Sequence, residues 1–338
     1  MFKNFFFFIF LILISLVVSH LDLINYGLGQ AKGQLNIVQK AVPIEELLSD
    51  LSFEDSLKQK IRIINKVRQY AIDSIGLQNS TNYTTFYDQE GKVILWNLSA
   101  CAPYEFTPKT WGFPFLGSFP YKGFFELEKA QLEKAKLDKL DYDTRIRPVG
   151  GWSTLGWFSD PILSNMLNRS EGGLAELIIH ELTHATLFIR DDVTFNENLA
   201  SFIGERGAMK FLASHYGASS PFLTDYLAQQ EDEKRFVKHM LFAYDLLDER
   251  YQSIKAYPES VKEIEKHFLI DEIIASLDTV SFHNIRYRRI FEKARPNNAY
   301  FMSFQRYHSV EDSLNHLLTH QFNNDLRAFT IGMKEYHE

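Results

Sequence analysis

Residues 174–188 read LAELIIHELTHATLF, and positions 180–184 carry the pattern His-Glu-x-x-His. Apolar residues surround the two histidines on most sides, which predicts a buried helix over 171–189. Side chains four residues apart share one face of a helix, so His180 and His184 can reach the same metal ion. Two histidines and a glutamate are unfavourable in a buried helix unless something satisfies them. The segment therefore predicts one catalytic zinc ion, with Glu181 leaning over the zinc-bound water as the general base.

A catalytic zinc ion requires a third protein ligand, and several acids follow the motif. The candidates are Asp191, Asp192, Glu197 and Glu205. Leu187 and Arg190 occupy the positions at which a metzincin carries glycine and histidine, so the sequence excludes that class.

Glu197 is the candidate that we expect to bind the metal. It opens the next predicted helix, 194–214, and a helix returning antiparallel to the first would place its first turn over the histidines. The stretch Asn196-Glu197-x-x-Ala200 also resembles the second-helix ligand motif of gluzincins. The alternative is a capping box, in which Thr194 and Glu197 only satisfy the helix N-terminus. Of the other acids, we expect the two aspartates to be loop residues and Glu205 to support the ligands or face the substrate.

The rest of the chain predicts an α+β fold that is predominantly helical and zincin-like, with a small β-hairpin and sheet region. Residues 83–87 and 93–96 are β-rich runs separated by five residues, which predicts a hairpin. Residues 101–123 hold prolines, glycines and aromatics and predict an ordered loop, and 144–149 predicts a strand. Apolar periodicity predicts further helices, over 44–51, 52–76, 123–140, 220–255, 258–277 and in shorter pieces between 296 and 336.

The N-terminus reads MFKNFFFFIFLILISLVVSHLDLI over residues 1–24. A basic residue, Lys3, precedes an apolar run over 5–18 that would be about 21 Å long as a helix, shorter than the ~30 Å hydrocarbon core. These features predict a signal sequence or an uncleaved membrane anchor, and hence export to the cell envelope or periplasmic side. No cysteine lies near the end of the run, so lipid attachment through an N-terminal cysteine is excluded. Residues 25–338 would then form the metallopeptidase domain.

Composition narrows the functional classes further. The 338 residues are 45% hydrophobic and 23% charged, which is typical of a globular protein. The net charge of -7 argues against nucleic acid as a partner, because phosphate binding needs a basic surface. The only cysteine, Cys101, allows neither an internal disulfide nor a cysteine zinc site, and we expect it to be buried. Nucleotide-binding glycine motifs are absent from the sequence.

Several other polar residues could contribute to a peptidase site. An oxyanion donor could come from a set of tyrosines and a histidine, namely Tyr121, Tyr287, His283 and Tyr307. Asn298 is expected to make loop hydrogen bonds. An exopeptidase needs a carboxylate for the substrate amine, for which Glu205 or Asp160 could serve. Residues 152–160 could be an edge strand that aligns a peptide, or a packed loop under the site.

The motifs together resemble a known family. Residues 153–161 (STLGWFSDP), 180–184 (HELTH) and 195–200 (FNENLA) are similar to segments of the bacterial "predicted aminopeptidase" family of zinc metallopeptidases. Looser similarity extends over further segments, 26–33, 93–100, 111–114, 120–124 and 297–299. The resemblance implies an exported metallopeptidase with His180, His184 and Glu197 as ligands and Glu181 as base. The lipoprotein cysteine common in that family is missing here.

We therefore expect an exported zinc-dependent peptidase, in particular an aminopeptidase, that hydrolyses peptide bonds with metal-activated water. The peptide would be its partner, together with a membrane if residues 1–24 stay attached. One alternative is a zinc endopeptidase of the cell envelope. A second is a non-catalytic exported protein with a structural zinc ion, and a third is a binding module whose contact face is formed by aromatics of 104–125.

Overall fold

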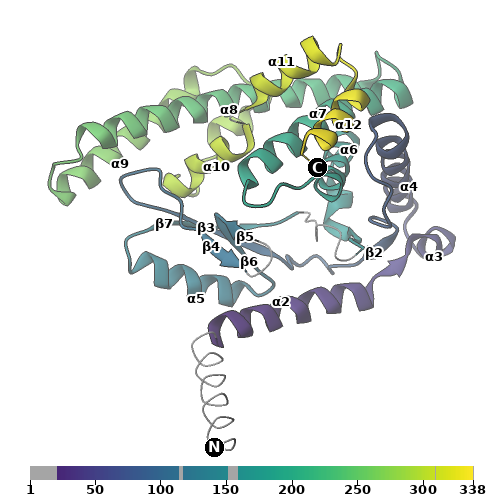
Figure 1. Ribbon diagram of the computed structural model, residues 1–338, viewed down its shortest axis with the longest axis horizontal. Coiled ribbons are helices and arrows are strands. Elements are labelled where there is room, and N and C mark those ends of the chain that lie inside the picture. The colour runs from purple at the N-terminus through teal and green to yellow at the C-terminus, as the bar shows by residue number, and fades with distance from the viewer. Residues whose placement is uncertain (1–20, 114–116, 151–158, 309, 338) are drawn as a thin grey trace, which may run out of the picture.

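Helices with one apolar face gather on one side of short strands, and two further helices lie on the opposite side (Figure 1). The computed structural model describes residues 21–113, 117–150, 159–308 and 310–337. The protein is mostly helical with small sheets, which confirms the predicted fold class at this level.

The helices after residue 43 follow the predicted apolar periodicity, whereas α2 was not predicted. In chain order they are α2 (Leu21–Lys40), α3 (Ile44–Ser49), α4 (Asp55–Tyr70), α5 (Leu127–Asp138), α6 (Glu171–Thr186), α7 (Val193–Tyr216), α8 (Pro221–Ser253), α9 (Glu259–Ser276), α10 (Asn298–His308), α11 (Glu311–Gln321) and α12 (Leu326–His337). Short helical turns are η1 (Ala71–Ile75), η2 (Ser164–Asn168), η3 (Leu277–Thr279) and η4 (Ile285–Arg289). The α4–η1 helix ends where Gly76 adopts a left-handed φ of 83°, a conformation that glycine reaches without strain.

Three small sheets hold the described strands. These are β1 (Val42–Pro43), β2 (Thr85–Tyr87), β3 (Trp96–Cys101), β4 (Trp111–Phe113), β5 (Gly117–Phe119), β6 (Tyr121–Phe124), β7 (Asp143–Pro148) and β8 (Ile162–Leu163). The first sheet has the order β1-β2-β8, in which β2 runs antiparallel to β1 and parallel to β8. The second has the order β6-β3-β7 and is antiparallel throughout. Strands β4 and β5 form a separate antiparallel pair.

The predicted hairpin between 83–87 and 93–96 is wrong. β2 pairs with β1 and β8 instead, and β3 begins only at Trp96. The residues after β2 are fixed elsewhere, because the Gln89 amide donates to Ser164 Oγ (2.9 Å) and its side-chain oxygen accepts from the Asn165 amide (3.0 Å). These bonds turn the chain toward η2, so the two runs cannot fold back on each other.

The described parts of the segment 101–123, which are 101–113 and 117–123, are not simply a loop. They contain β4, β5 and the start of β6. The rings of Phe113 and Phe119 pack edge-on between β4 and β5, with centroids 5.9 Å apart. Because β6 pairs with β3, the predicted helix over 123–140 begins only at Leu127.

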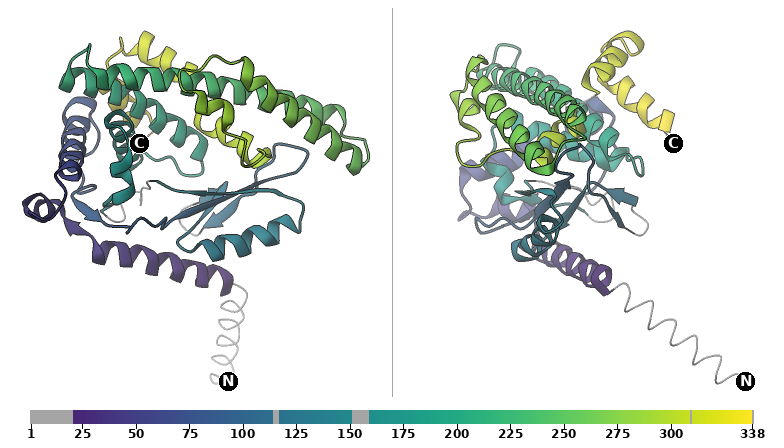
Figure 2. Two further views of the ribbon diagram at one scale, coloured as in Figure 1. Left: turned by 180° about the vertical axis from the view of Figure 1, so that it is seen from behind. Right: turned by 90° about the vertical axis from the view of Figure 1, so that its left-hand side faces the viewer.

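The main core lies where α4, α6 and α7 pack together. Its fully buried members include Ile64, Val67, Ile178 and Leu182. Sheet β6-β3-β7 packs against α10 on one face and α5 on the other, and Leu98 of its central strand is fully buried. The long helix α8 and its neighbour α9 form an arm with its own apolar cluster (Figure 2).

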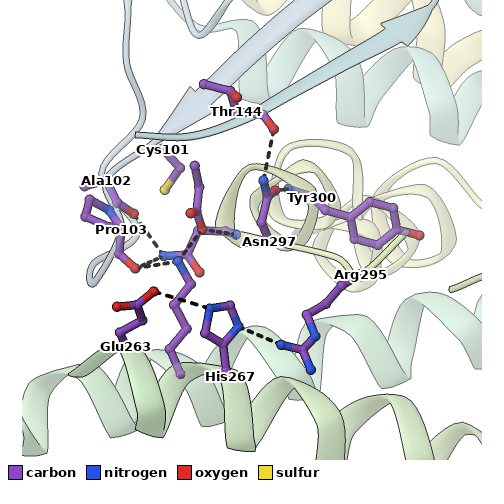
Figure 3. A network of polar contacts seen from close by, with 12 residues as sticks. Cys101, Ala102, Pro103, Thr144, Glu263, His267, Arg295, Asn297 and Tyr300 are labelled. Carbon is purple, nitrogen blue, oxygen red and sulfur yellow. Dashed lines mark hydrogen bonds and ion pairs between the residues drawn. The ribbon is translucent and has the colours of Figure 1, made fainter. Parts of the chain in front are cut away.

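A polar network fastens this arm to the sheet (Figure 3). Asn298 is fully buried, and its side chain donates to the carbonyls of Ala102 (2.9 Å) and Pro103 (3.0 Å). Lys266 of α9 contacts the carboxylate of Asp143 at 2.6 Å, and that carboxylate also accepts from the Asn298 amide. Asn298 therefore makes the loop hydrogen bonds that were expected of it. Cys101 beside this network is buried, also as expected.

Most of the predicted N-terminal segment lies outside the described residues. Its last four residues, 21–24, belong to α2. No helix in the described ranges is both long enough and apolar enough to span a bilayer.

Candidate metal centre

Helix α6 carries the His-Glu-x-x-His motif through the middle of the core. It begins at a regular cap, because Ser170 Oγ accepts from the Gly173 amide (3.2 Å). Helix α7 crosses close beside it at Gly204. A Cβ on Gly204 would lie 3.0 Å from the Glu176 carbonyl oxygen and 3.3 Å from His180 Cβ. The missing side chain thus lets α7 approach α6 at the level of the first histidine.

The turn between α6 and α7 is held by Asn196. Its side-chain oxygen accepts from the Ile189 amide (2.8 Å), and its nitrogen donates to the Ile189 carbonyl (2.7 Å). Asp192 caps α7 by accepting from the Phe195 amide (3.0 Å). The capping box expected as the alternative therefore does not form, because α7 begins at Val193 and Thr194 is already inside it. Glu197 is left free to point at α6.

The structure brings His180, His184 and Glu197 together. The two Nε2 atoms are 3.1 Å apart, and each is 3.5 Å from the same carboxylate oxygen, Glu197 Oε2. Within the described ranges, no other three His, Cys, Asp or Glu side chains bring their ligand atoms this close. Atoms bound at ~2.0–2.1 Å to a tetrahedral zinc ion are about 3.3–3.4 Å apart. The separations observed between these three atoms fit a zinc ion of that geometry.

The three side chains are mostly buried. The side chains of His184 and Glu197 are 8% and 11% exposed, whereas that of His180 is 18% exposed, so solvent reaches the group from that side. His184 Nδ1 is buried and has no hydrogen-bond partner among the described residues. That nitrogen can carry the ring proton, which leaves Nε2 with a lone pair for a cation.

Charges within the group shift its protonation. Burial opposes ionisation of Glu197, but the two neighbouring imidazoles outweigh it and hold the pKa of this carboxyl well below its ordinary value. Burial also acts to lower the pKa of His180, but the hydrogen bond with Glu197 and the charges of Glu181 and Glu197 raise it overall. Glu197 therefore keeps its negative charge beside the two imidazoles.

Glu181 lies on the same helix, next to the ligand group. It is 7% exposed, and no hydrogen bond holds its carboxylate within the described part of the chain. Burial raises the pKa of Glu181, although His180 and His184 partly oppose this. A carboxylate that is free of fixed partners and close to a cation can accept a proton from a water molecule there.

The other acids that followed the motif lie elsewhere. Asp191 accepts from the Ser118 amide (2.8 Å), and Asp192 is the α7 cap. Glu205 is 2.7 Å from Lys234 Nζ of α8. The two aspartates are thus loop residues, as expected, and Glu205 belongs to an ion pair.

The oxyanion candidates are scattered. Tyr287 donates its hydroxyl to Glu233 (2.7 Å), and the His283 ring lies 3.6 Å from Glu231. Tyr121 lies in β6, where its ring packs edge-on against Phe119. The side chain of Tyr307 and residues 151–158 lie outside the described structure, so the proposed edge strand over 152–160 has no description except at its last two residues.

Two residues near the motif were not foreseen. Tyr83 is fully buried with a left-handed φ of 63°, and its hydroxyl has no hydrogen-bond partner among the described residues. Burial, and then the charges of Glu181 and Asp160, raise the pKa of Tyr83, so this tyrosine lies within electrostatic reach of Glu181. Glu176, one turn before His180, accepts from Tyr226 (2.9 Å). Only the four-residue spacing of Glu176 from His180 could have indicated it.

Comparison with known proteins gives one match. A family model described as "Putative aminopeptidase" matches residues 25–338. No curated protein and no solved structure matches the chain. The family model spans everything after the apolar N-terminal segment, including the candidate metal centre, and its description supports a peptidase-like function. The chain therefore belongs to the "Putative aminopeptidase" family.

Proposed function

We propose that the chain is an exported zinc-dependent aminopeptidase whose metal ion is held by His180, His184 and Glu197. The observation that carries this proposal is the convergence of three ligand atoms, from two helices, at separations of 3.1 and 3.5 Å. These separations match the edges of a tetrahedral zinc site. A peptide is the substrate that the family description supports.

The number of ligands favours a catalytic ion over a structural one. Structural zinc sites are usually closed by four protein ligands, whereas catalytic sites keep one position open. Three side chains form the group in the described residues, and His180 keeps its exposed edge. A structural site would also have no use for Glu181.

The chain's own residues would divide the reaction as follows. A zinc ion supplies Lewis acidity to the substrate carbonyl and acidity to a water molecule. Glu181 accepts the proton from the attacking water and then delivers it to the departing amine. His180, His184 and Glu197 fix the ion's position, and Gly204 and Asn196 fix the two helices that carry them.

The choice of aminopeptidase rests on the family description. An exopeptidase must hold the substrate's amino group, but Glu205 is already paired with Lys234, and Asp160 is only 2% exposed. A zinc endopeptidase of the cell envelope is therefore the alternative. Export is part of the same proposal and rests on the apolar run over residues 5–18.

The test uses the full chain in detergent and compares wild type with Glu181→Gln. Zinc content is measured by elemental analysis, and hydrolysis is followed on one peptide with a free and one with an acetylated N-terminus. We expect one zinc ion per chain in both proteins and cleavage of the free peptide by wild type alone.

Other results would support a different function or refute the proposal. Cleavage of both peptides at equal rates would make the protein an endopeptidase. Zinc in both proteins with activity in neither, over a broad peptide set, would favour a structural ion. A chain that binds no zinc would refute the proposal.

A further inference from the structure

Helix α2 has one side fixed to the body of the protein. The Tyr26 hydroxyl donates to the Gly123 carbonyl (2.9 Å), and Gln30 donates to the same oxygen. Gly33 lies so close to the Phe125 ring that a Cβ there would be 2.2 Å from a ring carbon. Ile37 on the same side is only 2% exposed. This side of α2 therefore has its partners within the chain.

The opposite side of α2 is apolar and uncovered. Its large side chains are 39–64% exposed, and they are Leu21, Ile24, Leu28, Leu35 and Val38. Ala31, also exposed, fills the gap in the series. The spacing of three and four residues keeps all six on one stripe, which is about 26 Å long at ~1.5 Å per residue. Aligned exposed apolar side chains of this kind mark a contact surface.

The position of α2 indicates what covers the stripe. The helix lies along the edge of the molecule opposite α8, as Figure 1 and the left view of Figure 2 show. Residues 1–20 precede it directly, and their sequence contains the apolar run over 5–18. If that run enters a bilayer, α2 begins within three residues of the bilayer surface.

The polar residues beside the stripe suit such a surface. Lys32 lies beside the stripe, whereas Lys40 and Asp22, the only acid on α2, lie on the other side of the helix axis. A helix with an apolar face and no acid beside it can lie in the plane of a membrane interface, where the apolar side chains reach the acyl boundary and a lysine such as Lys32 meets anionic headgroups.

We propose that the outer stripe of α2 docks on the surface of a lipid bilayer and holds the folded domain against it. A second copy of the chain is the rival occupant, because the spacing also matches a coiled-coil seam. That seam would have fewer than three heptads. Its flanking positions include Asn25, Lys32 and Gln39, with no acid to pair with the lysine. The lipid surface is therefore the better fit.

The experiment places an environment-sensitive fluorophore on the full chain, reconstituted in vesicles of phosphatidylethanolamine and phosphatidylglycerol. Leu28→Cys and Leu35→Cys carry the label on the stripe. Ile264→Cys, which is 67% exposed on α9, is the matched control. Wild type serves as the control for background labelling, because its single cysteine, Cys101, is buried and should take up little label. Quenching by brominated lipid and by aqueous iodide is measured for each.

Brominated lipid should quench the labels at 28 and 35 at least fivefold more than the label at 264, and iodide should show the reverse order. Equal lipid quenching at all three positions would overturn the proposal, as would failure of the chain to stay on the vesicles. Protection from both quenchers would also overturn it. Disulfide-linked dimers through position 28 would then identify a second copy as the occupant, and their absence would indicate residues 1–20.

Discussion

The approach of α7 to α6 at Gly204 can be perturbed with a single methyl group. In Gly204→Ala the new Cβ would lie 3.0 Å from the Glu176 carbonyl oxygen and 3.3 Å from His180 Cβ. Comfortable contacts begin near ~3.5 Å, so α7 must withdraw from α6 by roughly 0.3–0.5 Å. Both obstacles belong to the backbone or its first side-chain atom, and neither can rotate away.

Two opposing effects set the size of the change. Overpacking of a tight interior destabilises by about 1–3 kcal/mol. Replacing glycine with alanine inside a helix stabilises by about 1 kcal/mol. We therefore expect Gly204→Ala to lower the free energy of unfolding by up to about 2 kcal/mol. The withdrawal also moves Glu197 away from the histidines, and a shift near ~0.5 Å is enough to impair a metal site.

The assay measures urea unfolding of the metal-free protein and zinc affinity by competition with a chelator. Gly27→Ala is the matched control, because Gly27 also lies in a helix but a Cβ added to it would meet no atom within 4 Å. The control should gain about 1 kcal/mol from helix propensity. Gly204→Ala should lose stability, and its zinc affinity should fall about tenfold, the size expected when support of a ligand is lost.

The reasoning fails if Gly204→Ala gains as much stability as Gly27→Ala. That result would mean that α6 and α7 have room for a methyl group, so close approach is not what places Glu197. Unchanged zinc affinity with the expected loss of stability would refute only the link between helix spacing and the metal group.

Three more predictions follow from the geometry. Asn196→Ala removes both bonds to Ile189 and should destabilise by about 2 kcal/mol or more, with weaker zinc binding by chelator competition; wild-type stability would contradict the role given to this clamp. In the metal-free protein, the raised pKa of His180 contributes stability below pH 6.5 that is lost as pH rises through the folded value, and the lowered pKa of Glu197 contributes stability above pH 4.5 that is lost on acidification. Between pH 6 and 9, the free energy of unfolding measured in urea should therefore fall more in wild type than in His180→Gln. Equal slopes of this free energy against pH in the two proteins would refute the stabilising role of His180. Asn298→Ala leaves buried carbonyls without donors and should destabilise by about 2–4 kcal/mol, mainly by loosening α9 and α10 in hydrogen exchange; uniform exchange would contradict the fastening role.

Local patterns predicted the helices well. The apolar spacing that marks α6, α7 and α8 can be read over a few neighbouring residues. Capping residues such as Ser170 are also adjacent in sequence to the helices that they cap. Strand pairing could not be predicted in the same way. β2 pairs with β8, which lies 76 residues further along the chain at Phe86 and Ile162, and no local signal marks so distant a partner.

The candidate site likewise combines residues that local spacing predicts with residues that depend on distant parts of the chain. His180, Glu181 and His184 are set by helical spacing, so the sequence places them on one helix turn without further information. Glu197 required the additional assumption that α7 returns antiparallel, which Asn196 and Gly204 bring about. Tyr83 comes from a segment some hundred residues earlier, and nothing in its neighbours indicated that it would lie near Glu181. The metal-binding role of the three ligand candidates stays a prediction.

The most direct test is X-ray absorption at the zinc edge for wild type and Glu197→Gln, each loaded with one equivalent of zinc. We expect wild type to show two imidazole nitrogens and oxygen ligands at ~2.0–2.2 Å in a four-coordinate shell. Glu197→Gln should bind zinc much more weakly, with a shell altered only in its oxygen ligands. A shell without imidazole in wild type, or one that Glu197→Gln leaves unchanged at equal affinity, would contradict a zinc site built from His180, His184 and Glu197.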